Sequence, residues 1–173
     1  SHNIENILSV IALTYALGVD VEDIHQAIAK FHGVAHRLER IRTLHGVTYY
    51  NDSKATNTDS TIKALESFNS PLVLIAGGKD KMTDLEEMME LVKTNVKELI
   101  LIGEAAQRFA EAAVKVGVPH IHRCESMEEA VSLSARIAAD GDVVLLSPAC
   151  ASFDWYARFE DRGDHFRRLV ERL

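Results

Sequence analysis

Apolar residues recur along the chain with two different periods, and these periods predict its secondary structure. Between Ile4 and Tyr15 they return every three or four positions, which is typical of one apolar helix face, and Gly18 offers a stop. Asp20 is suited to cap a second, short helix that continues to Ala29. The start of the chain is therefore expected to form a small helical unit.

Beyond residue 39 the apolar residues gather in short runs that alternate with amphipathic segments. Residues 40–50 predict two short strands joined around His45-Gly46. Further strands are expected at residues 72–76, 98–102, 120–123 and 143–146. Helical spacing covers residues 61–68, 84–92, 104–116, 127–138 and 154–173. This alternation predicts an α/β fold with a doubly wound, mainly parallel sheet that is flanked by helices.

Composition leaves this predicted fold unchanged but indicates which partners and which compartment to expect. The 173 residues carry 26 Asp and Glu against 19 Lys and Arg, a formal net charge of −7. An acidic chain lacks the basic surface that broad binding to nucleic acid or to an anionic membrane needs, so we expect neither partner. Cys124 and Cys150 are too far apart for a zinc or redox motif, and a reducing cytoplasm is the expected compartment.

Ligands of doubly wound sheets bind beyond the carboxyl ends of the strands, which singles out residues 51–57, 77–81, 103–104 and 147–154. The first of these segments is small, polar and charged, and Asn57 or Thr58 can cap the helix that follows. Free amides at such a helix start form a good seat for an anion, but a plain capping loop has the same composition. Lys54 is the least expected residue of this segment.

Residues 77–81, Gly-Gly-Lys-Asp-Lys, follow a strand that is expected to be buried. Paired glycines let the backbone turn sharply and approach a ligand, and the two lysines could receive a carboxylate or a phosphate. An ordinary turn at the end of a strand fits the same residues. The segment is not a phosphate-binding P-loop, because Val73 and Asp80 replace the first Gly and the final Ser or Thr of that motif.

Three further features have both a structural and a chemical interpretation. Cys150 is either a nucleophile or, as is more common, a small buried cysteine. His120 and His122 would share one face of a strand, but no third metal ligand lies near them in sequence, which favours surface histidines. The arginines at positions 158, 162, 167 and 168 stand among acidic residues and predict a solvated, ion-paired helix face.

Taken together, these segments resemble the Mur ligase family of bacterial peptidoglycan synthesis, and most closely its D-glutamate-adding members. The likeness runs through the chain in order: H-N-x-x-N at residues 2–6, G-x-x-H-R-x-E at 33–39, D-S-K-A-T-N at 52–57, G-G-K-D-K at 77–81, L-S-P-A-C-A-S-F-D at 146–154 and F-E-D-R-G at 159–163. It implies that residues 1–32 are the helical tail of a central ATP-binding domain and that residues 33–173 are a Rossmann-like amino-acid-binding domain.

The resemblance also implies a reaction and a set of site residues. ATP would phosphorylate the alanine carboxylate of UDP-N-acetylmuramoyl-L-alanine, and the amine of D-glutamate would attack the acyl phosphate. ATP and Mg²⁺ are the expected cofactors, and the family's phosphate-binding loop lies upstream of the H-N-x-x-N helix. D-Glutamate would be bound by Lys54, Thr56, Lys81, Ser152, Phe153 and Phe159, and ATP by Asn6, Arg37 and Asp52.

We therefore expect the 173 residues to contain no residue that transfers the phosphoryl group and no metal ligand, to have no ligase activity alone, and to be monomeric. Two alternatives stay open: a free-standing doubly wound module that binds a small acidic ligand or a nucleotide, and a related amide ligase that uses another amino acid. A purely structural domain is a third, for which substitutions at Thr56 and Ser152 would leave amino-acid use unchanged.

Overall fold

A computed structural model of the chain describes residues 2–31 and 33–173, with side chains from residue 4 onward. His2 and Asn3 of the H-N-x-x-N segment thus lie outside the described side chains. The chain divides into two compact units, residues 1–33 and 34–173. That the first unit is part of a larger ATP-binding domain stays a prediction.

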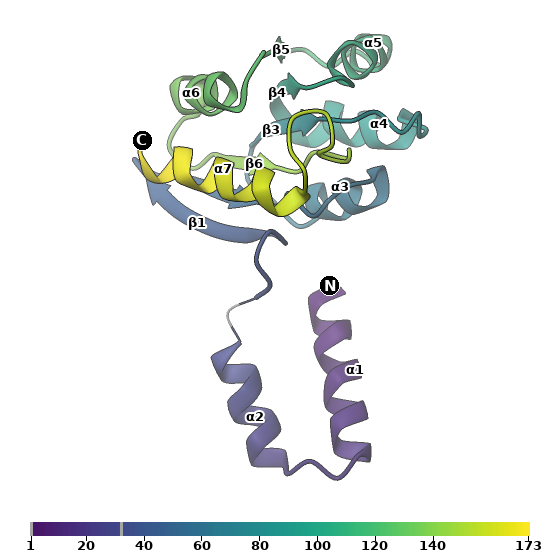
Figure 1. The fold of residues 1–173 in the computed structure, drawn as a ribbon, viewed down its shortest axis with the longest axis vertical. Helices are drawn as coiled ribbons and strands as arrows, with labels where there is room; N and C mark the ends of the chain where they lie inside the picture. The colour runs from purple at the N-terminus through teal and green to yellow at the C-terminus, as the bar shows by residue number, and fades with distance from the viewer. Residues whose placement is uncertain (1, 32) are drawn as a thin grey trace. The chain divides into compact units, whose positions relative to one another are not determined.

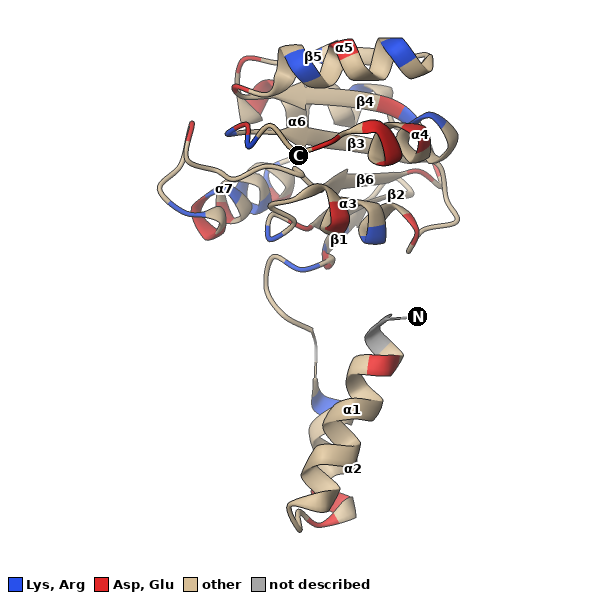
Figure 2. Ribbon diagram, turned by 90° about the vertical axis from the view of Figure 1, so that its right-hand side faces the viewer, with Lys and Arg blue, Asp and Glu red and all other residues tan. Residues whose placement is uncertain are grey.

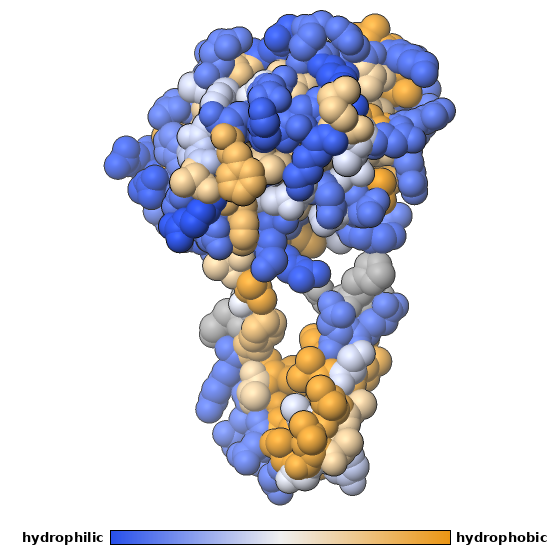
Figure 3. All heavy atoms as spheres, turned by 45° about the vertical axis from the view of Figure 1, so that its right-hand side comes forward, coloured by the Kyte–Doolittle hydropathy of each residue, from blue (hydrophilic) through white to orange (hydrophobic). Residues whose placement is uncertain are grey.

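The first unit contains the two helices that the apolar spacing predicts, α1 (His2–Ala16) and α2 (Val21–Lys30). Asp20 caps α2, because its side chain accepts the N–H of Glu22 at 2.8 Å. Much of the apolar surface of this unit faces solvent, as the orange atoms in Figure 3 show; among the exposed side chains are Ile4, Leu8, Val10, Leu13 and Tyr15.

A six-stranded sheet forms the centre of the second unit among the described residues, in the order β1-β2-β6-β3-β4-β5. Its first two strands pair antiparallel as the expected hairpin, and every other pairing is parallel, which confirms the mainly parallel sheet. The strands are β1 (Glu39–Leu44), β2 (Val47–Asn51), β3 (Leu72–Gly77), β4 (Val96–Ile102), β5 (Ile121–Arg123) and β6 (Val143–Leu146).

Helices cover both faces of this sheet, and the alternation of side chains along each strand divides the core in two. Leu72 and Leu74 pack with the helices on one face, whereas Val73 and Ile75 pack with those on the other. Burial of each such side chain stabilises the fold by about 1.5–3 kcal/mol. Figure 1 shows α3 (Thr58–Leu65), α4 (Glu86–Asn95) and α5 (Ala106–Val116) on one side of the sheet, and α6 (Met127–Ile137) and α7 (Phe159–Glu171) on the other.

The starts of two helices differ from the sequence-based expectation by three residues or more. The last helix begins at Phe159 and not at residue 154, because the N–H groups of Trp155 and Tyr156 both bond to the carbonyl of Ser152 and close a turn there. The helix expected at residues 61–68 begins earlier, at Thr58, where the side chain of Asn57 accepts the N–H of Ser60 at 2.8 Å. No helix among the described residues is long and apolar enough to span a membrane.

The strand order decides where the loops lie. Strand β6, late in the chain, lies between β2 and β3, so the carboxyl ends of these three parallel strands are neighbours. The segments that follow them are residues 51–57, 147–154 and 77–81. Residues 103–104 follow β4, which pairs parallel with β3, so all four segments that the sequence singles out meet at one edge of the sheet.

Candidate functional site

Hydrogen bonds join the three loops at the carboxyl edge of the sheet. The Nζ atom of Lys81 donates to the carbonyl oxygen of Thr56 at 3.0 Å, which links the loop after β3 to the loop after β2. The backbone N–H of Lys79 donates to the carbonyl of Ala151 at 2.9 Å, and that of Gly77 to the carbonyl of Pro148 at 2.8 Å. The loops after β2, β3 and β6 thus form one continuous site.

The two lysines of residues 77–81 differ in charge environment. Lys79 Nζ lies 2.6 Å from the carboxylate of Glu104, so its charge is paired. Lys81 is exposed and donates only to a neutral carbonyl among the described residues. Between them, Asp80 forms a bidentate ion pair with Arg108, which holds the pKa of the Asp80 carboxyl below its usual range. Lys81 is therefore the lysine of this loop that is available to an anion.

Lys54 and Phe159 come together although 105 positions separate them. The Nζ atom of Lys54 lies 5.5 Å from the centroid of the Phe159 ring, within the range of a cation–π contact. The same ring packs edge-on against His36, with the centroids 6.0 Å apart. Phe159 therefore forms a wall beside the exposed ammonium group of Lys54.

Ser152 and Phe153, which are neighbours in the loop after β6, have opposite environments. Phe153 is 70% exposed, whereas Ser152 is 2% exposed. The Oγ atom of Ser152 is buried and has no hydrogen-bond partner among the residues that the structure describes. An unpaired buried hydroxyl is costly to keep, which makes the Oγ of Ser152 a candidate for a hydrogen bond to a ligand.

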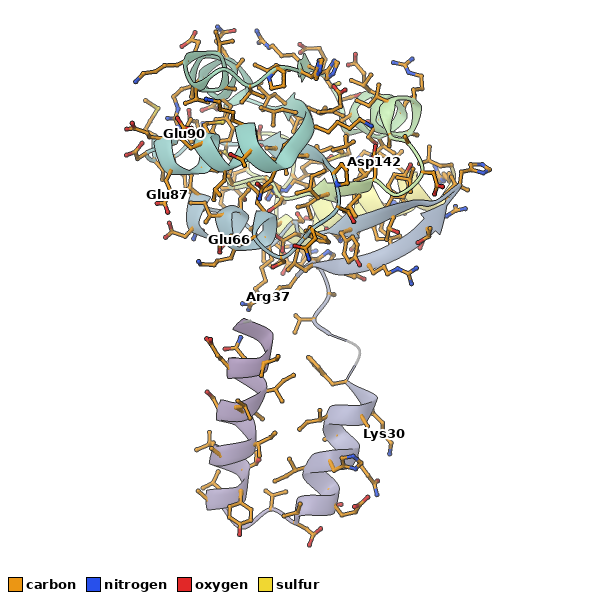
Figure 4. The ribbon with its side chains drawn as sticks, turned by 180° about the vertical axis from the view of Figure 1, so that it is seen from behind. Lys30, Arg37, Glu66, Glu87, Glu90 and Asp142 are labelled. Carbon is orange, nitrogen blue, oxygen red and sulfur yellow. The ribbon has the colours of Figure 1, made fainter. Side chains whose placement is uncertain are left out.

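The predicted nucleotide residues differ in their environments. Asp52 is 5% exposed, and its two carboxylate oxygens accept the N–H of Leu38 at 3.1 Å and the Oγ–H of Ser147 at 2.9 Å. Arg37 is exposed and labelled in Figure 4, and Asn6 is an exposed residue of α1 in the first unit. Asp52 is thus already held within the protein, and each of its oxygens has room for a further donor.

Burial raises the pKa of Asp52 from 3.8 to about 6, against the opposing effect of its hydrogen bonds and of Arg37. The folded protein therefore keeps this proton to a higher pH than the unfolded chain does. The protonated carboxyl favours the folded state, and this contribution to the free energy of unfolding is lost as the pH rises from about 4 through 6. As the pH rises from 4 to 7, we expect the free energy of unfolding of Asp52→Asn to increase relative to that of the wild type by up to about 3 kcal/mol, measured by urea unfolding. A pH-independent difference would contradict the raised pKa.

Sequence reasoning missed a buried polar network behind the site. Asn51 lies 3.0 Å from His36, Nδ2 to Nδ1, and both are buried. Gly163 makes room for this pair, because a Cβ there would overlap the His36 ring. The pair ties the segment before β1 to the end of β2. The neighbouring D-S-K and H-R strings draw attention to these positions, but nothing local shows that they touch.

The prediction of a solvated face on α7 is wrong for Arg162. Figure 2 shows basic and acidic positions next to one another on this helix, and Arg158 does pair with Asp161 at the surface, at 2.8 Å. Arg162, in contrast, is 1% exposed. A signal for this was present, because position 162 precedes the buried Phe166 and Val170 at intervals of four, on one helix face.

The remaining candidates have structural roles. Cys150 is buried, and burial raises the pKa of its thiol to about 12, so it is protonated and a poor nucleophile at neutral pH. His122 lies 2.8 Å from the carboxylate of Glu98, and His120 is exposed. Within the described ranges, no group of three or more His, Cys, Asp or Glu could hold a metal ion.

Comparison with known proteins shows which family the sequence matches. Residues 36–150 match the family described as Mur ligase, glutamate ligase domain. The chain is 48% identical, over 172 residues, to the UDP-N-acetylmuramoylalanine–D-glutamate ligase of Clostridioides difficile. This match covers 99% of the chain but 38% of that relative, so the chain spans well under half of the relative's length.

Solved structures share the fold at lower identity. The UDP-N-acetylmuramate-alanine ligase of Thermotoga maritima superimposes with a TM-score of 0.72 at 20% identity, over 99% of this chain and 37% of that one. The MurF ligase of T. maritima, solved in complex with ADP, superimposes with a TM-score of 0.58 at 20% identity, over 94% of this chain and 37% of that one.

Proposed function

The chain belongs to the Mur ligase family, and we propose that it is the amino-acid-binding part of a ligase that joins D-glutamate to UDP-N-acetylmuramoyl-L-alanine with ATP. Its relative of 48% identity bears the name of that enzyme. In the proposed reaction, ATP phosphorylates the alanine carboxylate and the D-glutamate amine attacks the acyl phosphate, so that an amide forms and phosphate leaves.

One observation carries this proposal: three loops present hydrogen-bond donors that have no acidic partner among the described residues. Lys81 has a positive charge and bonds only to a carbonyl, and the buried Oγ of Ser152 has no partner. D-Glutamate has two carboxylates, which need such donors and positive charge. We propose that it is bound by Lys54, Thr56, Lys81, Ser152, Phe153 and Phe159.

For the nucleotide, we propose contacts from Arg37 and Asp52 of the second unit and from Asn6 of the first. The ADP complex of the MurF ligase, which shares the fold, supports a nucleotide in this family. Mg²⁺ would accompany ATP and neutralise its phosphates. The described residues contain no group of three or more His, Cys, Asp or Glu that could hold a metal ion, and our proposal gives this chain no step that involves the metal.

The chemistry that remains for this chain is orientation. Lys81 and the groups around Ser152 would hold the two carboxylates of D-glutamate and so fix the position of its amine. When a nucleophile is held in line with its target, the entropy cost of a bimolecular encounter is met on binding and not in the chemical step. This positioning supplies a large part of the rate enhancement. The exposed apolar side chains of the first unit fit a role in contacting the rest of such a ligase.

The test is an amide-ligation assay of the intact protein with ATP, the UDP-linked alanine substrate and a panel of amino acids. We expect phosphate release and product with D-glutamate, and a kcat/KM at least about 100-fold lower with L-glutamate, glycine or meso-diaminopimelate. Protein donors that are fixed in position for the two substrate carboxylates reject a ligand that leaves them unpaired. The 173-residue chain alone is the control, and we expect it to give no turnover. Preference for another amino acid would assign the chain to a different amide ligase.

A further inference from the structure

Arg162 is the largest fully buried side chain of the described residues, and it has no carboxylate within ion-pair distance among them. Its guanidinium group donates only to neutral oxygens. Nε bonds to Ser53 Oγ at 2.9 Å, Nη2 to the carbonyls of Ser53 at 2.9 Å and Cys150 at 3.0 Å, and Nη1 to the carbonyl of Ala151 at 3.2 Å. A buried cation whose hydrogen bonds all go to neutral oxygens is rare, since desolvation disfavours its charge; Asp154 acts on it only by longer-range attraction.

Every acceptor of Arg162 belongs to a loop that carries proposed D-glutamate residues. Ser53 immediately precedes Lys54, and its Oγ donates in turn to the carbonyl of Phe159 at 2.7 Å. The two carbonyls after β6 immediately precede Ser152. One side chain from α7 therefore fixes the backbone on both sides of the proposed pocket.

The loop after β3 also packs against this group. A Cβ at Gly78 would approach Nη1 of Arg162 to 3.0 Å, so the glycine backbone lies directly against the guanidinium group. Burial lowers the pKa of Arg162 to about 10, which still leaves it protonated at neutral pH. The charge thus stays behind the three loops, where it favours an anionic ligand.

We propose that Arg162 is a positioning residue for the D-glutamate pocket, which it builds by joining the loops after β2 and β6 through its planar fork of donors. This inference rests on the proposed function. The fork is essential to it, because a lysine has a single ammonium group and cannot reach acceptors on two loops with the same geometry.

The test compares Arg162→Lys with Arg168→Lys in the intact ligase. Arg168 is an exposed residue of the same helix and provides the matched control. We expect Arg162→Lys to raise the KM for D-glutamate on the order of tenfold and to change the KM for ATP less than about twofold, because the lost bonds hold the amino-acid loops. Arg168→Lys should change neither constant.

A second variant covers the case in which Arg162→Lys does not fold. Ser53→Ala keeps the buried charge but removes the Oγ that accepts from Nε, and we expect it to raise the KM for D-glutamate by about threefold to tenfold, again without a change for ATP. Unchanged KM for D-glutamate in either folded variant, or an equal rise for both substrates, overturns the inference. Failure of the wild-type enzyme to use D-glutamate would instead refute the proposed function.

Discussion

Lys81→Ala in the intact ligase is expected to raise the KM for D-glutamate by about 10- to 100-fold and to leave the KM for ATP within about twofold. Lys81 is the lysine of the loop after β3 whose ammonium group has no acidic partner among the described residues; this group donates to the neutral carbonyl of Thr56. A charged hydrogen bond to a substrate carboxylate is among the stronger single contacts in a site. Steady-state kinetics with each substrate varied in turn measures the two constants.

Lys79→Ala is the matched control, because it removes the same charge two positions away. The Nζ of Lys79 lies 2.6 Å from Glu104, and so its charge is already paired. We expect its effect on the KM for D-glutamate to stay below about threefold, as is typical for an exposed ion pair. Equal effects of the two variants, or an equal rise in the KM for ATP, would show that Lys81 does not bind the amino acid.

Gly77→Ala is expected to lower the free energy of unfolding of the 173-residue chain by about 3 kcal/mol or more, and to prevent folding if the chain is only marginally stable. Gly77 ends β3 with φ at +114°, a conformation that side chains with a Cβ rarely adopt. A Cβ there would overlap the backbone carbonyl of Ile102 in β4, which cannot move without breaking the sheet. Urea unfolding followed by circular dichroism measures the loss.

Gly117→Ala separates backbone strain from the steric overlap. Gly117 caps α5 in the left-handed region, with φ at +86°, and nothing lies within 4 Å of a Cβ placed there. We expect a cost of only about 1 kcal/mol for this variant. A similar loss for both variants would mean that the steric overlap between a Cβ at Gly77 and the carbonyl of Ile102 adds nothing to the cost of backbone strain.

The sequence predicted the elements of the second unit well because their signals are local. The continuous apolar run of β3, which is buried on both faces, and the period of about 3.6 in the helices arise from residues a few positions apart. Helix boundaries were less predictable where the carbonyl of a loop residue accepts backbone N–H groups and forms a turn before the helix. The carbonyl of Ser152 accepts two N–H groups and so delays α7 by one turn and a half.

The candidate site divides in the same way. Lys81 and Ser152 lie in loops that the rule for doubly wound sheets selects from the sequence, and their residue types fit the motifs of the family. Arg162, in the F-E-D-R-G motif, and Asn51, which directly precedes the D-S-K-A-T-N motif, were not predicted to be buried polar groups. Their partners are distant in the chain: Arg162 donates to Ser53 across 109 positions, and Asn51 faces His36 across 15.

The sequence by itself thus determined the succession of strands and helices, the doubly wound class, and the residue types at the carboxyl ends of the strands. Only the tertiary structure decided that β6 lies between β2 and β3, that Arg162 faces inward, and that the Ser152 hydroxyl is buried with no partner among the residues described. The reason is physical: hydrophobic periodicity is a property of neighbouring residues, whereas desolvation and hydrogen-bond partners depend on which distant segments the folded chain brings into contact.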